Sequence, residues 1–228
     1  MPEAAERIVA LVPMRHSSER VRGKNYRPLG GRPLFHHIVG SLLACSEIAE
    51  VVIDTDSELI KNDVAASFPA VRVIDRPREL LGGEVPMTAV LAHDISIVEA
   101  DLYLQTHSTN PLLKQSTISA AIRAFLDHRD EHDSLFTVTP LQVRLWTPGG
   151  TAINHDSDVL LRTQDLEPVM EENSCMYLFD RPTLERSGRR IGERPLLFPL
   201  DRDEAWDIDD ESDWRIVEAL FAEASKGA

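Results

Sequence analysis

Short apolar runs alternate with segments of helical spacing along most of the first 140 residues. The apolar runs predict buried strands at residues 8–12, 51–53, 71–74, 101–105 and 134–139. Apolar positions that recur every three or four residues predict helices at 34–45, 57–67, 87–98 and 117–128. Strands that alternate with helices of this length are typical of a parallel sheet covered on both faces, with the carboxyl ends of its strands at one edge. The expected fold class is therefore α/β.

The alternation of predicted strands and helices ends after Pro140. Residues 141–172 contain Gly149-Gly150 and many polar residues with little periodicity, which indicates an inserted arm. Apolar strands are predicted again at 175–179 and 196–200, and an amphipathic helix at 214–222 closes the pattern. There is no internal repeat and no low-complexity linker, so we expect one domain over residues 1–228, with residues 141–172 as an excursion from it.

Composition narrows the class of protein. The 228 residues are 43 % hydrophobic and 27 % charged, which is ordinary for a globular domain and excludes disordered, collagen-like and coiled-coil chains. The net charge of −14 would repel a phosphate backbone, so we expect no nucleic-acid partner. No apolar run approaches the roughly 20 residues of a membrane helix, and the acidic start is unlike a signal peptide. We therefore expect no membrane association and a cytoplasmic location, with Cys45 and Cys175 as buried thiols.

The loop after the first predicted strand is cationic in an otherwise acidic chain. Residues 14–25 include Arg15, Arg20, Arg22 and Lys24, together with hydroxyl groups such as that of Ser18. Backbone N–H groups, hydroxyls and a few cations together suit a polyphosphate. The spacing matches neither a Walker loop nor a dinucleotide-binding fingerprint. A solvated basic loop that neutralises nearby acids is an equally good interpretation of composition alone.

Two further segments carry candidate chemistry. Asp207 and Asp209 flank Ile208, so in an extended segment both carboxylates share one face while Ile208 points inward. Two carboxylates on one face suit Mg²⁺ held together with substrate phosphates, although acids at the start of a helix would look similar. Gln105, Thr106 and the residues that follow offer donors and acceptors for sugar hydroxyls, or form an ordinary turn before a helix.

In this order the segments resemble the CMP-N-acylneuraminate synthetases, or acylneuraminate cytidylyltransferases, over nearly the whole chain. Arg15, Lys24-Asn25 and the stretch from Pro28 to Leu34 are similar to the family's R-x(8)-K-N…LGGKPL signature. Asp207-Ile208-Asp209 is similar to its D-I-D metal pair. Weaker matches are Asp54-Thr55-Asp56 for S-T-D, Arg76-Pro77, the stretch from Gln105 to Leu112 for Q-x-T-S-P-L, and Asn173-Ser174 for N-G-S/A.

The resemblance implies a Rossmann-like nucleotidyltransferase fold, a three-layer sandwich with an inserted dimerisation arm. It implies transfer of CMP from CTP to an acidic sugar with release of pyrophosphate, Mg²⁺ as cofactor, and a homodimer formed through residues 141–172. The reaction then needs positioning and electrostatic stabilisation and no covalent nucleophile.

The same resemblance assigns roles to individual residues. Arg15 and Lys24 would hold the triphosphate and neutralise charge as pyrophosphate leaves, and Asp207 and Asp209 would bind the metal. These four residues are the predicted catalytic residues. The nucleotide-binding residues would be Arg15, Ser18, Lys24, Asn25 and Arg76, of which Asn25 and Arg76 would read the base. Gln105, Thr106 and Asn173 would contact the acceptor sugar. His16 and His107 are alternative proton carriers or plain loop histidines.

The chain departs from the family pattern where the acceptor would bind. Residues 162–172 contain one arginine and four acids, so an acceptor carboxylate would be repelled unless Arg162 or Arg144 turns inward. We expect the acceptor among sialic acids, other nonulosonic acids, Kdo-like acids or phosphonates, although the Lys24-Asn25 pair is less typical of the Kdo enzymes. A uridylyl- or guanylyltransferase and a catalytically inactive nucleotide-binding protein are the other readings. All the enzyme readings require Lys24 and Asp209 to meet at one cleft.

Overall fold

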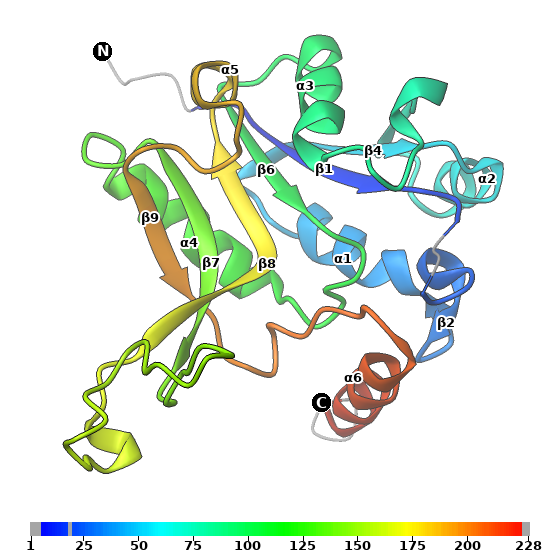
Figure 1. The fold of residues 1–228 in the computed structure, drawn as a ribbon. Coiled ribbons are helices and arrows are strands. Elements are labelled where there is room, and N and C mark those ends of the chain that lie inside the picture. Colours follow the sequence, from blue (N-terminus) through cyan, green and yellow to red (C-terminus); the bar gives the residue numbers. More distant parts are fainter. Residues whose placement is uncertain (1–5, 18–19, 225–228) are drawn as a thin grey trace.

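A computed structural model describes residues 6–17 and 20–224 (Figure 1). Seven strands form one sheet in the order β5-β4-β1-β6-β8-β7-β9. Their bounds are β1 (Ile8–Met14), β4 (Ile48–Thr55), β5 (Arg72–Asp75), β6 (Leu102–Thr106), β7 (Ser134–Leu141), β8 (Val169–Phe179) and β9 (Pro195–Pro199). Strands β5, β4, β1 and β6 are parallel, so their carboxyl ends lie at one edge as predicted.

Strand β8, for which the sequence pattern set no direction, runs antiparallel to both β6 and β7. The chain leaves β7, makes the excursion and returns along the same strand, without the crossover helix that a parallel pair requires. Strand β9 then pairs in parallel with β7 at the sheet's edge. The result is a mixed sheet, and it brings β8 beside the carboxyl end of β6.

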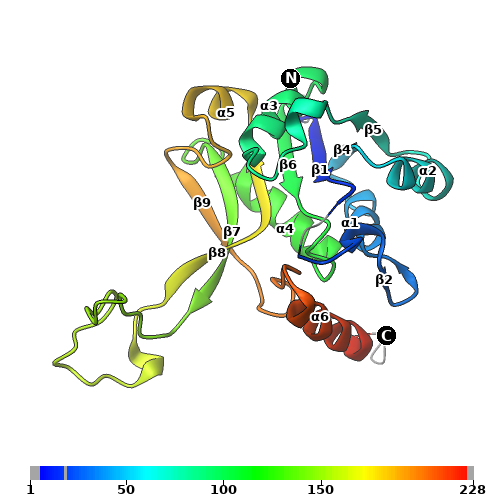
Figure 2. The ribbon, with the colours of Figure 1, turned by 45° about the vertical axis from the view of Figure 1, so that its right-hand side comes forward.

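Helices cover both faces of this sheet, which makes a three-layer sandwich (Figures 1 and 2). One layer holds α1 (Leu34–Leu43), α2 (Glu58–Ser67) and α4 (Gln115–Asp127), and the other holds α3 (Met87–Ile97) and α5 (Arg181–Ser187). Alternate residues of β1 supply the two cores: Ala10 and Val12 pack toward the first layer, Val9 and Leu11 toward the second. The sequence pattern did not predict α5, a short helix whose start is capped by Asp180.

A small hairpin joins the N-terminal signature to the last helix. Strands β2 (Pro28–Leu29) and β3 (Arg32–Pro33) are joined by Gly30 and Gly31, with φ of 56° and 81°. Two consecutive positive φ values explain the pair of glycines. A side chain on Gly30 would also place its Cβ 2.1 Å from the Phe221 ring in α6 (Glu211–Ala224). The turn therefore packs closely against the helix that follows the Asp207–Asp209 segment.

The excursion projects from the body of the molecule, as Figure 2 shows. The β7–β8 pairing continues out to Leu141 and Val169, so the two ends of the predicted 141–172 segment belong to strands. Beyond them lie a Trp146–Ala152 bridge and a short 3-10 helix at Thr163–Asp165 (η3). Several large apolar side chains of this arm are exposed, and these include Trp146, Ile153, Val159, Leu160 and Leu161.

Other sequence predictions agree with the structure at the level of elements. The remaining predicted strands and helices are present, with ends shifted by a few residues. Cys45 and Cys175 are both buried free thiols. None of the helices within the described residues is both long and apolar enough to cross a bilayer.

Candidate active site

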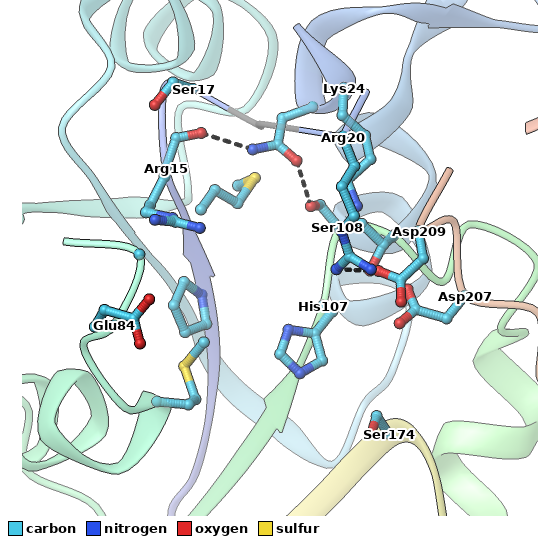
Figure 3. A pocket seen from close by; sticks show the side chains of 16 residues that line it. Arg15, Ser17, Arg20, Lys24, Glu84, His107, Ser108, Ser174, Asp207 and Asp209 are labelled. Atoms are coloured by element: carbon cyan, nitrogen blue, oxygen red, sulfur yellow. Dashed lines mark hydrogen bonds and ion pairs between the residues drawn. The ribbon is translucent and has the colours of Figure 1, made fainter. Parts of the chain in front are cut away.

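A cleft of about 560 Å³ opens at the carboxyl edge of the parallel strands (Figure 3). Ligands of open α/β sheets bind at this edge. In Figure 3, Arg15 and Glu84 lie on one side of the cleft, while Lys24, Asp207 and Asp209 lie on the other. The lining is predominantly polar and charged, so the cleft suits a charged, water-soluble ligand.

The loop after β1 places its cations by turning back into a short 3-10 helix, Lys24–Tyr26 (η1), entered through Gly23 with φ 67°. The buried Asn25 holds this loop in place. Its Nδ2 donates to the backbone oxygen of Arg15 at 2.8 Å, and its Oδ1 accepts from Ser108 Oγ at 2.7 Å. Asn25 therefore lines the cleft, with its amide engaged by the protein on both sides.

The Asp207-Ile208-Asp209 segment has the alternation that its sequence suggests. Ile208 is fully buried against α6 and the β2–β3 hairpin, and both aspartates line the cleft. The backbone N–H of Ile208 donates to the oxygen of Thr109 at 3.0 Å. Lys24 Nζ donates to the backbone oxygen of Ile208. The basic loop and the acidic couplet therefore meet, as every enzyme reading of the sequence required.

Burial and charge act against each other at this junction. Burial lowers the pKa of Lys24, while Asp207 and Asp209 act to raise it. Burial likewise raises the pKa of Asp207, although a hydrogen bond from Thr109 opposes the shift. Asp209 forms an ion pair with Arg20 at 2.7 Å. The arrangement holds two carboxylates and several cations around one point in the cleft.

The couplet fits a divalent metal on the chemistry of its atoms. Asp207 Oδ1 is buried and has no hydrogen-bond partner among the described residues, a costly state for a carboxylate oxygen unless a ligand satisfies it. Two hard carboxylate oxygens beside a phosphate-sized space match the way Mg²⁺ is usually held. Asp207 and Asp209 are the residues that would hold it.

The residues after β6 form a buried polar group beside this junction. Gln105 is fully buried: its Nε2 bonds to Thr106 O and to His107 Nε2, at 3.0 and 3.1 Å. Its Oε1 accepts from Arg190 Nη1 at 2.5 Å. Thr106 is also buried and donates to Cys175 O at 2.7 Å. Of this group, His107 lines the cleft.

The environment of His107 keeps its ring neutral. Burial lowers the pKa of His107 to about 3, and the charges of Arg190 and Lys24 act in the same direction. Because Arg190 fixes Gln105 Oε1 as the acceptor, Gln105 Nε2 is the donor and His107 Nε2 accepts. The Nε2 lone pair is therefore engaged, which argues against this atom as a proton carrier. The other histidine, His16, bonds through Nδ1 to Ser57 Oγ at 2.8 Å.

Arg76 is not brought to the cleft with the other expected nucleotide ligands. It lies buried with its Nε bonded to Asp54 Oδ1, and Asp54 stands where the family pattern has serine. Asp94 of α3 adds a second carboxyl beside this pair. Burial, together with the neighbouring Asp54, raises the pKa of Asp94 to about 9. Asp54, Arg76 and Asp94 thus form one interior charge cluster.

The remaining predicted residues are spread over three places. Asn173 lines a second cavity of about 470 Å³, which shares Ser174, Asp207 and Asp209 with the cleft. Arg144 and Arg162 stay in the arm, where they bond to Leu161 O and Asp165, so neither turns inward. Ser18 lies outside the described residues.

Four further residues at the site were not singled out as ligands from the sequence: Arg20, Thr109, Ser174 and Arg190. Arg20 belonged to the cationic loop, so composition pointed toward it. Ser174 has φ 57°, unusual for a residue other than glycine, and it occupies the position where the family has glycine. Nothing in the local sequence marks Arg190, which reaches Gln105 from 85 residues away.

Comparison with known proteins agrees with this geometry. The chain is 29 % identical over 233 residues to the CMP-N,N'-diacetyllegionaminic acid synthase of Legionella pneumophila, covering 94 % of this chain and 96 % of that protein. It is 23 % identical over 230 residues to the pseudaminic acid cytidylyltransferase of Campylobacter jejuni, covering 93 % and 95 %.

Solved structures support the fold. A CMP:2-keto-3-deoxy-manno-octonic acid synthetase complexed with CTP superposes with a TM-score of 0.71 at 16 % identity, covering 96 % of this chain and 99 % of that one. A 4-diphosphocytidyl-2C-methyl-D-erythritol synthase from Anaerococcus prevotii superposes with a TM-score of 0.67 at 12 % identity, covering 96 % and 97 %. The Rossmann-like nucleotidyltransferase fold expected from the resemblance is thereby confirmed.

The sequence model of the cytidylyltransferase family matches residues 9–198, from β1 to β9. This span contains the cationic loop, the residues after β6 and the arm, while the Asp207–Asp209 couplet follows directly after it. The chain belongs to the cytidylyltransferase family.

Proposed function

We propose that this cytidylyltransferase transfers CMP from CTP to an acidic nonulosonic sugar with the help of Mg²⁺. The observation that carries the proposal is the hydrogen bond from Lys24 Nζ to Ile208 O, which puts the cationic loop against the acidic couplet in one cleft. A triphosphate needs the cations, and a divalent metal needs the carboxylates. The names of the similar proteins support an acidic sugar as acceptor.

The nucleotide binds with its phosphates between Arg15 and Lys24 in this proposal. Both side chains line the cleft, and together they place positive charge around the phosphate groups. The acceptor hydroxyl attacks the α-phosphorus and releases its proton to water, the bond from the α-phosphorus to the bridging oxygen breaks, and pyrophosphate leaves with the bond's electron pair. Arg15 and Lys24 stabilise the charge that grows on the leaving group. Asp207 and Asp209 would hold Mg²⁺, which would supply further charge stabilisation at the phosphates when bound.

The acceptor binds at the end of the cleft bounded by His107 and Ser174. This end adjoins the second cavity, and Ser174, Asp207 and Asp209 line both spaces. An acceptor placed here has its hydroxyl next to the couplet, where the α-phosphate lies. Gln105 and Asn173 act as supports of this end, because their amides bond to neighbouring protein groups.

Asn25 and Arg76 have separate roles in this proposal. Asn25 joins the loop after β1 to Ser108 through its hydrogen bonds to Arg15 O and Ser108 Oγ. In this way it shapes the part of the cleft where cytosine binds. Arg76 would have to leave Asp54 to contact a nucleotide, at the cost of a buried ion pair. We therefore infer that Arg76 stabilises the end of β4 through its ion pair with Asp54.

The arm makes a homodimer in this proposal. It projects from the body and exposes apolar side chains that a second copy would cover, with Leu160 93 % exposed. Light scattering should give twice the chain mass, and Ile153→Glu with Leu160→Glu should give the monomer. A monomeric wild-type protein would contradict the dimer and leave the reaction untouched.

The test of the reaction uses purified protein, CTP, Mg²⁺ and four acceptors: N-acetylneuraminic, N,N'-diacetyllegionaminic, pseudaminic and 3-deoxy-manno-octulosonic acids. We expect pyrophosphate release with at least one acid. We also expect a thermal shift with CTP and Mg²⁺ that exceeds the shifts with UTP and GTP. No turnover combined with no CTP shift would overturn the proposal. A larger shift with UTP or GTP would instead identify another nucleotide.

A further inference from the structure

Arg190 is a half-buried cation on the loop after α5. Its guanidinium donates to Gln105 Oε1 at 2.5 Å and lies 3.5 Å from the centre of the Tyr177 ring. Within the described ranges, no carboxylate oxygen comes within 4.0 Å of it, unlike Arg76 or Arg129. A guanidinium has five N–H donors in a planar fork, and Gln105 Oε1 takes one of them. The stack on Tyr177 holds the fork in a defined plane.

The guanidinium is one side chain away from the cleft. Gln105, its hydrogen-bond partner, contacts His107, and His107 lines the cleft beside Ser174 (Figure 3). Tyr177, its stacking partner, accepts a hydrogen bond from Ser174 Oγ at 3.2 Å through its hydroxyl oxygen. Both partners of Arg190 therefore touch the wall where the acceptor binds in the proposed function.

The charges around Arg190 leave room for an anion. Tyr177 donates its hydroxyl to Glu172, whose charge acts on Arg190 without forming an ion pair within 4.0 Å among the described residues. Burial raises the pKa of Tyr177 to about 12, so the phenol stays protonated and continues to donate to Glu172. Burial lowers the pKa of Arg190, while Tyr177 and Glu172 act to raise it, and an arginine side chain stays charged in proteins. His107 stays neutral between Arg190 and Lys24 and adds no competing charge.

The arginines that the sequence suggested as ligands of an acceptor carboxylate do not lie at the cleft. Arg162 pairs with Asp165 and Arg144 bonds to Leu161 O, both within the projecting arm. Arg202 lines the second cavity, but it is exposed and is followed by Asp203 and Glu204. A cation in water binds a carboxylate weakly, whereas a desolvated, oriented guanidinium binds it strongly.

We infer that Arg190 is the specificity-determining residue that binds the carboxylate of the acceptor sugar, with Gln105 and Tyr177 orienting its guanidinium. This inference rests on the proposed function. It names a residue outside the cleft's immediate lining, on the loop after α5, as the group that distinguishes an acidic sugar from a neutral one. The inference requires the free edge of the fork to reach the carboxylate when the acceptor is bound.

The test compares the best acid of the acceptor panel with its carboxamide. We expect wild-type protein to prefer the acid by about 100-fold in kcat/KM, because a charge-assisted bidentate pair is lost with the amide. In Arg190→Met the preference should fall to about 5-fold or less, through KM for the acid, with KM for CTP unchanged. Arg190→Lys should keep part of the preference, since it keeps charge but loses the fork.

Matched variants separate this role from others. Arg189→Met, at the exposed neighbouring position, and Arg202→Met should both retain the full preference. Equal losses for acid and amide in Arg190→Met would mean a structural role and overturn the inference. Loss of the preference in Arg202→Met would move the role to that residue and also overturn it. In either case turnover by the wild type keeps the proposed function intact, whereas absent turnover and absent CTP binding contradict the proposed function itself.

Discussion

Lys24 Nζ donates a hydrogen bond to the backbone oxygen of Ile208, which lies 184 residues farther along the chain, between Asp207 and Asp209. This contact joins the first loop of the sheet to the segment that leads into the last helix. It places an ammonium group beside two carboxylates without forming an ion pair within 4.0 Å with either, as far as the described residues go. Among these residues Lys24 and Asp207 have no ion-pair partner, while Asp209 pairs with the exposed Arg20, so a ligand that carries phosphates and a metal has to displace only that surface pair.

Replacing Lys24 should impair the use of CTP. Lys24→Met removes the charge and keeps the length of the side chain, and we expect kcat/KM for CTP to fall by about 100-fold. Initial-rate kinetics at saturating acceptor measure this effect. The matched control is Arg22→Met, at an exposed position of the same loop. This variant should change kcat/KM for CTP by less than about 3-fold. Similar losses in both variants would mean that only the overall charge of the loop matters.

Removing either charge of the couplet should weaken the response to Mg²⁺. Asp207→Asn and Asp209→Asn should each lower the rate by about 100-fold or more and raise the Mg²⁺ concentration needed for half-maximal rate. Asp210→Asn is the control, because Asp210 accepts hydrogen bonds from the N–H groups of Ser212 and Asp213, and asparagine also caps helices. An unchanged Mg²⁺ titration in both couplet variants would remove the metal from these residues.

His107 should make the protein less stable in mild acid. Its pKa is about 3 in the folded protein and about 6.5 when unfolded, so the unfolded chain binds an extra proton as the pH falls below about 6.5. The free energy of unfolding then decreases. Between pH 7 and pH 5 this decrease should be smaller by about 1–2 kcal/mol in His107→Gln than in wild type, measured by urea unfolding. The exposed His128→Gln should behave like wild type, and a similar change there would contradict the assignment.

Asp94 should act in the opposite pH direction. Its folded pKa of about 9 lies far above the ordinary value of 3.8, so between these values the folded state keeps a proton that the unfolded chain releases, and the free energy of unfolding falls as the pH rises. Asp94→Asn resembles the protonated acid and should raise the free energy of unfolding at pH 8 by about 1–3 kcal/mol, with little gain near pH 4. Thermal unfolding across this range measures it. A variant that is equally destabilised at both values would show that the carboxyl itself is needed.

Two adjacent glycines should differ in their tolerance of a methyl group. Gly31→Ala meets no atom within 4 Å and should cost about 1 kcal/mol through its positive φ alone. Gly30→Ala adds a clash with the Phe221 ring and should cost about 3 kcal/mol, measured by chemical denaturation. Phe221→Ala should narrow the difference between the two glycine variants. Equal costs in the wild-type background would mean that α6 moves freely away from the hairpin.

Local pattern determined much of this protein. Period-two and period-3.6 hydrophobicity located most strands and helices, because an element's own residues decide which of its faces can be buried. The same principle placed Asp207 and Asp209 on one side of Ile208, and the composition of residues 14–25 identified the cationic loop. These features depend on neighbours within a few residues, so they can be predicted from the sequence alone.

Tertiary structure alone decided the direction of β8, the inward turn of Arg76 and the position of Arg190. Strand β8 runs antiparallel because the arm returns the chain beside β7, and Arg76 is drawn inside by Asp54, 22 residues earlier. Arg190 meets Gln105 across 85 residues of sequence. Burial and charge act through space, so the pKa of His107 and the partner of a guanidinium are set only once distant segments pack together.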